Sequence, residues 1–435
     1  MKRAVNIGII GFGRVGTGVI KILRSHSHLI ERKIGTRLNI KRVCDLDIRS
    51  DRGIKIRKSV LTTRWGEVVN DPDIDIVIEL IGGTDSARRV VLSAIKKGKH
   101  IVTANKALLS KYWGEIFSFA TEQNVLIYFE ASVGGGIPVI QALNEGLAAN
   151  KITRILGILN GTTNYILTRM THQGLSLREA LQDARAAGFS EANPRLDIEG
   201  EDAVHKLAIL SSIAFATHVP LDKIHCEGIR DIMVEDIQMA REEFGYIIKL
   251  LSIMKVYKSE IELRVHPTLI PAEHLLTSVN DENNAVYITG DAVGKTMFYG
   301  KGAGQMSAAS AVVSDIIYLA RNVFHGIAGT FPYVLYEKNK ELKFRSIEDI
   351  LTKYYIRFTT VDRPGVLAQI SGVLGKNDVS IAAVYQKGHA LSREVPIVMI
   401  THQAREGHLL HALKEIDRFP VVKKKSVFIR IEESA

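Results

Sequence analysis

The sequence predicts an α/β protein of several domains, for reasons found at its beginning, middle and end. An apolar strand, a glycine-rich turn and a helix open the chain at 5–23, and strands then alternate with helices as far as residue 129. After residue 152 this alternation stops, and from residue 351 the elements follow the order β-α-β-β-α-β. These patterns are typical of a doubly wound parallel sheet, an α+β domain and a ferredoxin-like domain, in that order.

The composition is that of a soluble globular protein. With 435 residues, 46% of them hydrophobic and 24% charged, the chain should form about two to four domains. No stretch approaches the roughly 18 consecutive apolar residues that a membrane span requires. The basic, apolar beginning does not fit a signal peptide, because Arg14 and regularly spaced glycines interrupt it. We therefore expect a cytoplasmic protein without a membrane partner.

The charge and the cysteines exclude further classes. The formal net charge is +10, but the basic residues are scattered in small groups without interleaved aromatic residues, so nucleic-acid binding is not expected. Attraction of an anionic cofactor is the better explanation. Cys44 and Cys226 are far apart and have no C-x-x-C companion. The sequence therefore predicts neither a disulfide framework nor a structural zinc site.

The glycine-rich turn at 11–16, GFGRVG, lies between an apolar strand at 5–10 and a helix that runs to about residue 23. This is the G-x-G-x-x-G pattern in the context that dinucleotide binding demands. The glycines permit a tight turn and a close approach of the backbone, and the helix N-terminus offers N–H groups to a pyrophosphate. The turn therefore predicts a Rossmann domain that binds a dinucleotide.

The second strand, at 38–44, ends at Asp45. A carboxylate at this place accepts hydrogen bonds from the adenosine ribose and favours NAD. Arg49 and Arg52 follow closely and are equally suited to a 2′-phosphate, so NADP stays open as the alternative.

The alternation then continues toward the carboxyl edge of the sheet, where ligands bind in such folds. Gly82 ends one of the strands, and Lys106 follows another. We expect Lys106 to point toward the nicotinamide or the substrate, the alternative being a surface lysine at a strand end. The expected elements are strand 74–81, helix 85–97, strand 100–103, helix 108–121 and strand 125–129.

Three consecutive glycines at 134–136 follow Glu130 and precede Pro138. Their exposed carbonyl and N–H groups suit an anion or, together with Glu130, a hard cation. A flexible connection is the competing interpretation.

The acidic stretch at 188–206 runs into an apolar helix. Asp202 and Lys206 are four residues apart and therefore share one helix face. An i,i+4 pair is often a solvated surface feature, but this helix is apolar nearly all round and should be buried. Charges at its start are then expected to face a cleft, where ionisable groups need partners or a task.

Later segments complete the expected organisation. Strand-like runs at 262–265 and 285–289 indicate a second sheet, and a helix at 307–320 follows the glycines of 300–304 and should pack back on the first domain. The charged stretch at 331–350 looks like a linker. The segment from 351 is too small to hold the same chemistry and is expected to be a regulatory module.

Together these motifs make the chain resemble the homoserine dehydrogenase family along essentially its whole length, with a C-terminal ACT domain. The motifs are GFGRVG (11–16), VTANKALLS (102–110), FEASVGGGIPVI (129–140), GILNGTTNYIL (157–167), GFSEANPRLDIEGEDAVHKLAIL (188–210), GKGAG (300–304) and ASAVVSD (309–315). The resemblance implies a dinucleotide-binding domain at 1–130 with 300–330 packed on it, a substrate and dimerisation domain at 131–299, a linker at 331–350 and an ACT domain at 351–435.

The resemblance also implies an activity, the reversible NAD(P)H-dependent reduction of L-aspartate 4-semialdehyde to L-homoserine in threonine, methionine and isoleucine biosynthesis. In this family's pattern Lys206 matches the proton donor, with Lys106 and Asp197 also catalytic, and Glu191 and Asp202 bind the substrate. The matching cofactor contacts are Gly11, Phe12, Gly13, Val15, Gly16, Gly82, Lys106, Gly188 and Gly304. Glu130, Val133, Gly135 and Ile137 match a monovalent cation site, usually for Na⁺.

The family pattern further implies a homodimer or homotetramer and an amino-acid effector, threonine first, near 362–365 of the ACT domain. Asn193 stands where the family commonly has Asp, and 305–307 replace a frequent Pro-Thr pairing, which affects local loop geometry. Two other functions compete. A semialdehyde dehydrogenase would need a thiol nucleophile, and a non-catalytic nucleotide- and amino-acid-binding regulator would need no reacting group at all.

Overall fold

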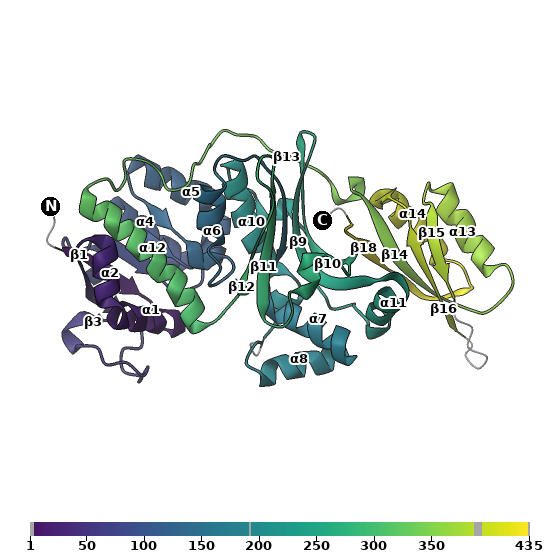
Figure 1. The fold of residues 1–435 in the computed structure, drawn as a ribbon, viewed down its shortest axis with the longest axis horizontal. Helices are drawn as coiled ribbons and strands as arrows, with labels where there is room; N and C mark the ends of the chain where they lie inside the picture. The colour runs from purple at the N-terminus through teal and green to yellow at the C-terminus, as the bar shows by residue number, and fades with distance from the viewer. Residues whose placement is uncertain (1–3, 191–192, 387–393, 434–435) are drawn as a thin grey trace. The chain divides into compact units, whose positions relative to one another are not determined.

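The computed structural model describes residues 4–190, 193–386 and 394–433. The chain divides into two compact units, each of which is assembled from separate stretches of sequence (Figure 1). Unit 1 comprises Met1–Thr153, Asp202–Ile224 and Glu282–Glu341, and unit 2 comprises Arg154–Glu201, His225–Asp281 and Leu342–Ala435. Within the described part of the chain, no helix is both long and apolar enough to cross a membrane.

Unit 1 contains the predicted doubly wound sheet, which is six-stranded with the order β3-β2-β1-β4-β5-β6. All its pairs are parallel, and β1 lies at the centre between β2 and β4. The strands β1, β4 and β5 are mostly apolar and buried, as is typical of a parallel sheet that helices cover, whereas only the end of β2 is buried. The strands are β1 (Ala4–Ile10), β2 (Arg37–Cys44), β3 (Leu61–Thr62), β4 (Ile76–Glu79), β5 (His100–Thr103) and β6 (Ile127–Tyr128). The helices between them include α1 (Arg14–Ser25), α2 (Ser27–Ile34), α3 (Gly66–Val69), α4 (Asp85–Lys96) and α5 (Lys106–Glu122).

A late helix, α12 (Gln305–His325), completes this layer and lies beside α1 and α2 (Figure 1). A Cβ added to Gly18 of α1 would stand 2.9 Å from the Cβ of Ala309, so the two helices approach closely. The side chain of Gln305 donates a hydrogen bond of 2.9 Å to the carbonyl of Arg14. Helix α12 therefore holds α1, the helix that follows the glycine-rich turn, in its position.

The rest of unit 1 includes a hairpin and a buried helix. The hairpin pairs β11 (Asn283–Gly290) with β12 (Gly294–Lys301) in antiparallel register. Helix α10 (Glu201–Phe215) carries Asp202 and Lys206, and its residues from Leu207 to Ile213 are all buried. The expectation of a buried helix with charges only near its start is thus confirmed. Short helical turns surround these elements: η2 (Glu130–Ser132), α6 (Val139–Gln141), η3 (Ala142–Gly146) and η4 (Leu221–Lys223).

Unit 2 is built on a long antiparallel pair, β9 (Tyr246–Tyr257) and β10 (Glu260–Pro271), with β7 (Ile152–Ile158) on the other side of β9. Of these, only the middle of β10, at 262–265, and the end of β7, where the apolar run at 155–159 predicts a buried strand, were expected from the sequence. The short strand β8 (His225–Cys226) pairs with β10 in parallel. The helices are α7 (Gly161–Gln173), α8 (Leu177–Ala186), α9 (Arg195–Ile198) and α11 (Val234–Phe244), and η5 (Leu275–Ser278) follows β10.

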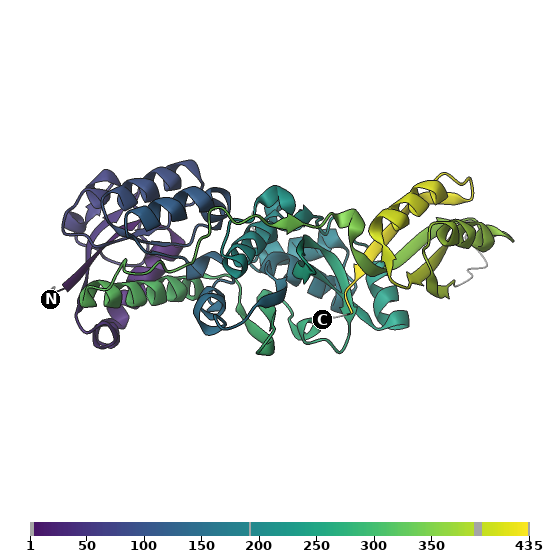
Figure 2. The same cartoon turned by 90° about the horizontal axis from the view of Figure 1, so that it is seen from above.

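The C-terminal part of unit 2 has the predicted ferredoxin-like order. Its sheet runs β18-β14-β16-β15, and β18 pairs in parallel with β10 through Thr268 and Leu269. The two helices pack on this sheet around one apolar core (Figure 2). The elements are β13 (Lys343–Phe344), η6 (Ile347–Asp349), β14 (Leu351–Thr360), α13 (Val366–Lys376), β15 (Ile381–Tyr385), β16 (Val395–Thr401), β17 (Ala404–Arg405), α14 (Glu406–Ile416) and β18 (Val422–Ile431).

Candidate active site

Lys106 is the first residue of α5 and lies at the carboxyl edge of the parallel sheet. Two bonds fix this corner: Asn105 caps the helix by accepting from the N–H of Leu108, and its side-chain amide donates to the carbonyl of Gly83 over 2.7 Å. The hydroxyl of Thr103 donates to the buried carboxylate of Glu79 over 2.6 Å. The turns after β4 and β5 are therefore tied together beneath the lysine.

The Asp202 carboxylate contacts two ammonium groups. One oxygen is 2.6 Å from Nζ of Lys206, one turn along α10, and the other is 3.1 Å from Nζ of Lys106. The side chains of Asp202 and Lys206 are each 12% exposed, whereas that of Lys106 is 39% exposed. The structure thus brings together three of the predicted site residues in a partly buried cluster. Two protonated amines around one carboxylate can donate a proton and can bind an anionic oxygen.

Three further polar residues, not predicted as site residues, connect α5 with α10 and with the segment that follows α10. The hydroxyl of Ser110 in α5 lies 2.7 Å from Nδ1 of His205 in α10. Nε2 of His218 lies 3.1 Å from the carbonyl of Ser110. The sequence offered a signal for Ser110 and for His205, because they lie in the family motifs at 102–110 and 188–210. These contacts fix the spacing between Lys106 and Lys206.

The glycine-rich turn has no room for a larger residue at Gly11 or at Gly16. Gly11 has φ +109°, and a Cβ there would stand 2.5 Å from the carbonyl of Leu80. A Cβ on Gly16 would stand 2.1 Å from the carbonyl oxygen of Gly11. Helix α1 starts after Gly13 without a side-chain cap and without an acidic residue in its first turn. Its N–H groups and positive dipole end therefore suit a pyrophosphate, as the sequence predicts.

Asp45 and Arg52 are neighbours at the end of β2. Asp45 accepts a hydrogen bond of 2.6 Å from the N–H of Phe12, and its other oxygen is 3.5 Å from the Arg52 guanidinium. The same guanidinium lies 5.2 Å from the centre of the Phe12 ring. The place that would meet the adenosine ribose thus presents both the group that favours NAD and a group that suits a 2′-phosphate.

The remaining predicted residues are divided between the two units. Gly82 and Gly304, both with positive φ, belong to unit 1, where Gly304 precedes α12. Gly188 and Asp197 belong to unit 2. Asn160, the N-cap of α7, donates a hydrogen bond of 2.6 Å from its side chain to Asp197. Glu191 lies outside the described residues.

The predicted cation loop has one buried carboxylate, Glu130, and a second, Asp315 of α12, lies beside it. Glu130 accepts hydrogen bonds from the N–H groups of Ile140 and Gln141 over 2.8 and 2.9 Å, and its own N–H donates to Asp315 over 2.8 Å. Burial raises the pKa of Glu130 to about 7, against these bonds, and raises the pKa of Asp315 as well. Among the described residues, no group of three His, Cys, Asp or Glu side chains forms a metal site. A cation held by Glu130 and backbone carbonyls would fit this negative, buried loop.

Neither cysteine suits a nucleophile. Burial raises the pKa of both Cys44 and Cys226 to about 11, and nearby carboxylates add to the shift. Both thiols are therefore protonated near neutral pH, which argues against the acylating semialdehyde dehydrogenase considered above.

Comparisons with known proteins agree with this arrangement. Family models match at residues 11–130 (homoserine dehydrogenase, NAD binding domain), 138–317 (homoserine dehydrogenase) and 354–421 (ACT domain). The homoserine dehydrogenases of Neisseria gonorrhoeae and Bacillus subtilis are 43% and 40% identical, with 99% of each chain covered. A homoserine dehydrogenase structure from Thiobacillus denitrificans has a TM-score of 0.93 at 41% identity, over 99% of this chain and 98% of that one. A hyperthermophilic archaeal homoserine dehydrogenase in complex with NADPH has a TM-score of 0.60 at 29% identity, over 72% of this chain and 97% of that one.

Proposed function

The chain belongs to the homoserine dehydrogenase family, and we propose that Lys206 is the group that exchanges a proton with the substrate oxygen in its reaction. The protein is an NAD(P)-dependent oxidoreductase that interconverts L-aspartate 4-semialdehyde and L-homoserine. The observation that carries the proposal is the Asp202 carboxylate, which contacts the Lys206 and Lys106 ammonium groups at the carboxyl edge of the sheet.

The chemistry needs one proton for each hydride. The bound NAD(P)H supplies the hydride to the aldehyde carbon, and negative charge then develops on the carbonyl oxygen. A lysine ammonium, with an unperturbed pKa of about 10.4, starts protonated and can neutralise this charge. Lys106 contributes a second positive charge to the same oxygen, and Asp202 orients both amines while it binds the substrate ammonium together with Glu191. The oxidative direction releases one proton for each hydride removed, so alkaline buffer should favour homoserine oxidation.

Replacement of Lys206 tests this role. Lys206→Ala is expected to lose on the order of 10²- to 10⁴-fold in kcat, because a positioned general acid contributes about that much. Lys111→Ala, which removes an exposed lysine from α5, is the matched control. The measurement is the aldehyde-dependent loss of reduced-nicotinamide absorbance, and near wild-type turnover in Lys206→Ala would remove that residue from the mechanism. Complete absence of turnover in the unmodified protein would instead favour a non-catalytic regulator.

We further propose that Arg52 sets the balance between the two nicotinamide cofactors. This is supported by its position 3.5 Å from Asp45, the carboxylate that favours NAD. Initial rates with NADH and NADPH measure the preference. Arg52→Ala is expected to raise the KM for NADPH more than that for NADH, and an equal change for both cofactors would contradict the assignment.

Two partners belong to the proposal as well. An amino acid, threonine first, is expected to bind near the turn at 362–365 between β14 and α13 and to inhibit from there. Rates with and without threonine test inhibition, and Asp362→Ala should raise the concentration needed for half-inhibition. Unchanged inhibition in Asp362→Ala would mean that the effector binds elsewhere.

The chain is also expected to form a homodimer or a homotetramer, and sedimentation equilibrium distinguishes these two states.

A monovalent cation, Na⁺ first, completes the proposed site. The carboxylate of Glu130 and the backbone of Val133, Gly135 and Ile137 would hold it. Support comes from the raised pKa of Glu130, because a buried carboxylate next to Asp315 gains from a nearby positive charge.

A further inference from the structure

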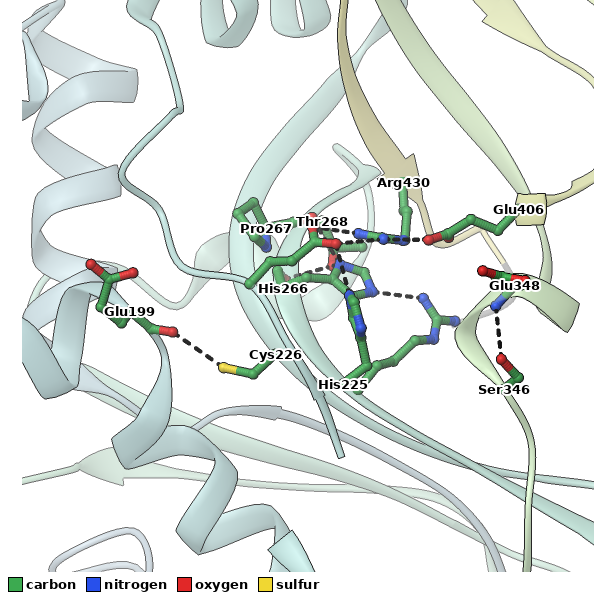
Figure 3. Close-up of polar contacts among 12 residues, drawn as sticks. Glu199, His225, Cys226, His266, Pro267, Thr268, Ser346, Glu348, Glu406 and Arg430 are labelled. Carbon is green, nitrogen blue, oxygen red and sulfur yellow. Dashed lines mark hydrogen bonds and ion pairs between the residues drawn. The ribbon is translucent and has the colours of Figure 1, made fainter. Parts of the chain in front are cut away.

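The guanidinium of Arg430, in the last strand of the ACT domain, is buried between two carboxylates (Figure 3). Its Nε and Nη2 donate to Glu406 at the start of α14, both over 2.6 Å. Its Nη1 and Nη2 donate to the two oxygens of Glu227, both over 2.7 Å. Glu227 follows β8 and lies outside the ferredoxin-like fold, so one arginine side chain connects the ACT domain to the strand pair β8–β10.

The Arg430–Glu227 pair is ionised over a wide pH range. Burial alone would raise the pKa of Glu227, but hydrogen bonds from Arg430 and His225 hold it well below its usual range. The pKa of Arg430 is raised by the two carboxylates, against the effect of burial. The buried Arg430 guanidinium holds a fixed geometry, because it would be left uncompensated without its carboxylate partners.

The backbone around Glu227 packs directly against the segment that ends α9. The N–H of Ile229 donates to the carbonyl of Ile198 over 2.9 Å, and Sγ of Cys226 lies 3.2 Å from the carbonyl of Glu199 (Figure 3). A Cβ added to Gly228 would stand 2.1 Å from the same Ile198 oxygen. At Gly228 and Ile229 the two segments therefore touch backbone to backbone, which leaves little room to absorb a shift.

The segment at Ile198 and Glu199 directly follows Asp197. The N–H of Gly200 donates to the carbonyl of Asp197 over 3.0 Å, and Asn160 holds the Asp197 carboxylate from the other side. A displacement of 226–229 would thus be passed to Asp197 through the Ile198 carbonyl. Helix α10, with Asp202 and Lys206, begins immediately afterwards in the chain.

We propose that Glu227, held in place by Arg430, is a positioning residue for Asp197, and that the ACT domain reaches the active site through this pair. The inference rests on the proposed role of Asp197 in the reaction. The Arg430–Glu227 pair would then couple β18 to the α9 turn as well as stabilise the fold, because a change in the position of β18 would move the backbone that contacts this turn. A direct mechanical link of this kind carries coupling without a long relay of side chains.

Glu227→Gln tests the link, because glutamine keeps the size of the side chain but removes the charge. We expect kcat/KM for homoserine to fall about 10-fold, since small misplacements of reacting groups cost factors of this size or larger, while the KM for the cofactor stays within about twofold. The matched control is Asp236→Asn. Asp236 of α11 is fully buried, whereas the Glu227 side chain is 40% exposed, but Asp236 likewise bonds to the ACT domain, accepting from Arg357 over 2.6 Å and from Tyr355 over 2.8 Å.

The two variants should both lower the melting temperature, but only Glu227→Gln should lower kcat/KM. Equal losses of kcat/KM in both would mean that the pair is merely structural, and would overturn the proposal. A wild-type kcat/KM in a folded Glu227→Gln would overturn it as well.

A double-mutant comparison separates this inference from the proposed function. Asp197→Asn alone tests whether Asp197 takes part in the reaction, and wild-type activity there would overturn this inference while leaving the proposed role of Lys206 intact. If Asp197→Asn is impaired, adding Glu227→Gln should change kcat/KM by less than about twofold further, because the second residue acts through the first. Multiplication of the two losses would show that Glu227 does not act through Asp197.

If Glu227→Gln does not fold, Gly228→Ala probes the same contact from the other side. Its methyl group would push against the Ile198 carbonyl and is expected to lower kcat/KM for homoserine by about 10-fold. Gly372→Ala, in helix α13 of the ACT domain, is the control, because a Cβ there meets nothing within 4 Å. Equal activity of Gly228→Ala, Gly372→Ala and the unmodified protein would overturn the proposal.

Discussion

The carboxylate of Asp202 accepts a hydrogen bond of 2.6 Å from the ammonium of Lys206, one turn further along the same helix. On an exposed helix such a pair contributes only a few tenths of a kcal/mol. Here both side chains are 12% exposed and α10 is otherwise apolar, so the pair is largely shielded from water. Electrostatic interactions are stronger where water is excluded, so the charge of Asp202 and the direction of the Lys206 ammonium should affect catalysis as well as stability.

Asp202→Asn should therefore disable the site without unfolding the protein. The neutral amide would remove the negative charge that the Lys206 and Lys106 ammonium groups share. We expect kcat/KM for homoserine to fall about 100-fold, with a rise in the KM for homoserine, because the substrate ammonium also loses a partner. Steady-state rates measure this, and Glu115→Gln, which breaks an exposed pair with Arg88, is the control. Equal activity of the two variants would exclude a role for the Asp202 charge.

Ser110→Ala should loosen the contact between α5 and α10. The change removes the hydroxyl that lies 2.7 Å from His205, next to Lys206 in sequence. We expect a loss of about 3- to 10-fold in kcat, the equivalent of about one hydrogen bond, with an unchanged KM for the cofactor. Thr121→Val, at the far end of α5, removes a hydroxyl that bonds to the Phe117 carbonyl and is the control. A kcat that is the same in both variants would show that the contact does not position the lysines.

Na⁺ should stabilise the protein more at pH 8 than at pH 5.5. Glu130 has a folded-state pKa of about 7, above its ordinary value of 4.5, so its contribution to stability is present below pH 4.5 and is lost as the pH rises through 7. A cation compensates only the ionised form, which dominates above pH 7. Melting temperatures in NaCl and in tetramethylammonium chloride of equal ionic strength measure the effect. A Na⁺ effect that persists in Glu130→Gln would place the cation elsewhere.

Because of Lys249, the free energy of unfolding should increase as the buffer becomes more alkaline. Burial lowers its pKa from 10.5 to about 8, while Nζ donates to the carbonyl of Val279 over 2.6 Å and to Asn280 over 3.1 Å. Because the unfolded chain binds this proton more tightly, stability rises with pH between about 8 and 10.5, by about 1.4 kcal/mol for each pH unit. Urea denaturation measures this as the difference between the unmodified protein and Lys249→Met. A difference that is constant over this window, as expected for the exposed Lys151→Met, would contradict the assignment.

The sequence predicted most of what depends on neighbouring residues. The glycine turn at 11–16, the alternation of strands and helices up to β6 and the β-α-β-β-α-β order at the end are local patterns, and the structure has all three. The i,i+4 relation of Asp202 and Lys206 on a buried helix is local in the same sense. Strand β9 was missed because most of its residues are apolar and no period of two marks it. In β10 polar and apolar residues alternate at 260–266, and only this part was expected as a strand, at 262–265.

What the sequence alone determined is therefore the type of each element and the family motifs; the tertiary structure decided which distant residues meet. Lys106 contacts Asp202 only because α5 and α10 pack together, and Arg430 joins Glu227 only because β18 pairs with β10. Local backbone preferences act over a few residues, whereas these contacts follow from how helices and strands share a common buried core. A pattern of residues along the chain does not encode that packing directly, so the partners of these charged groups became known only with the fold.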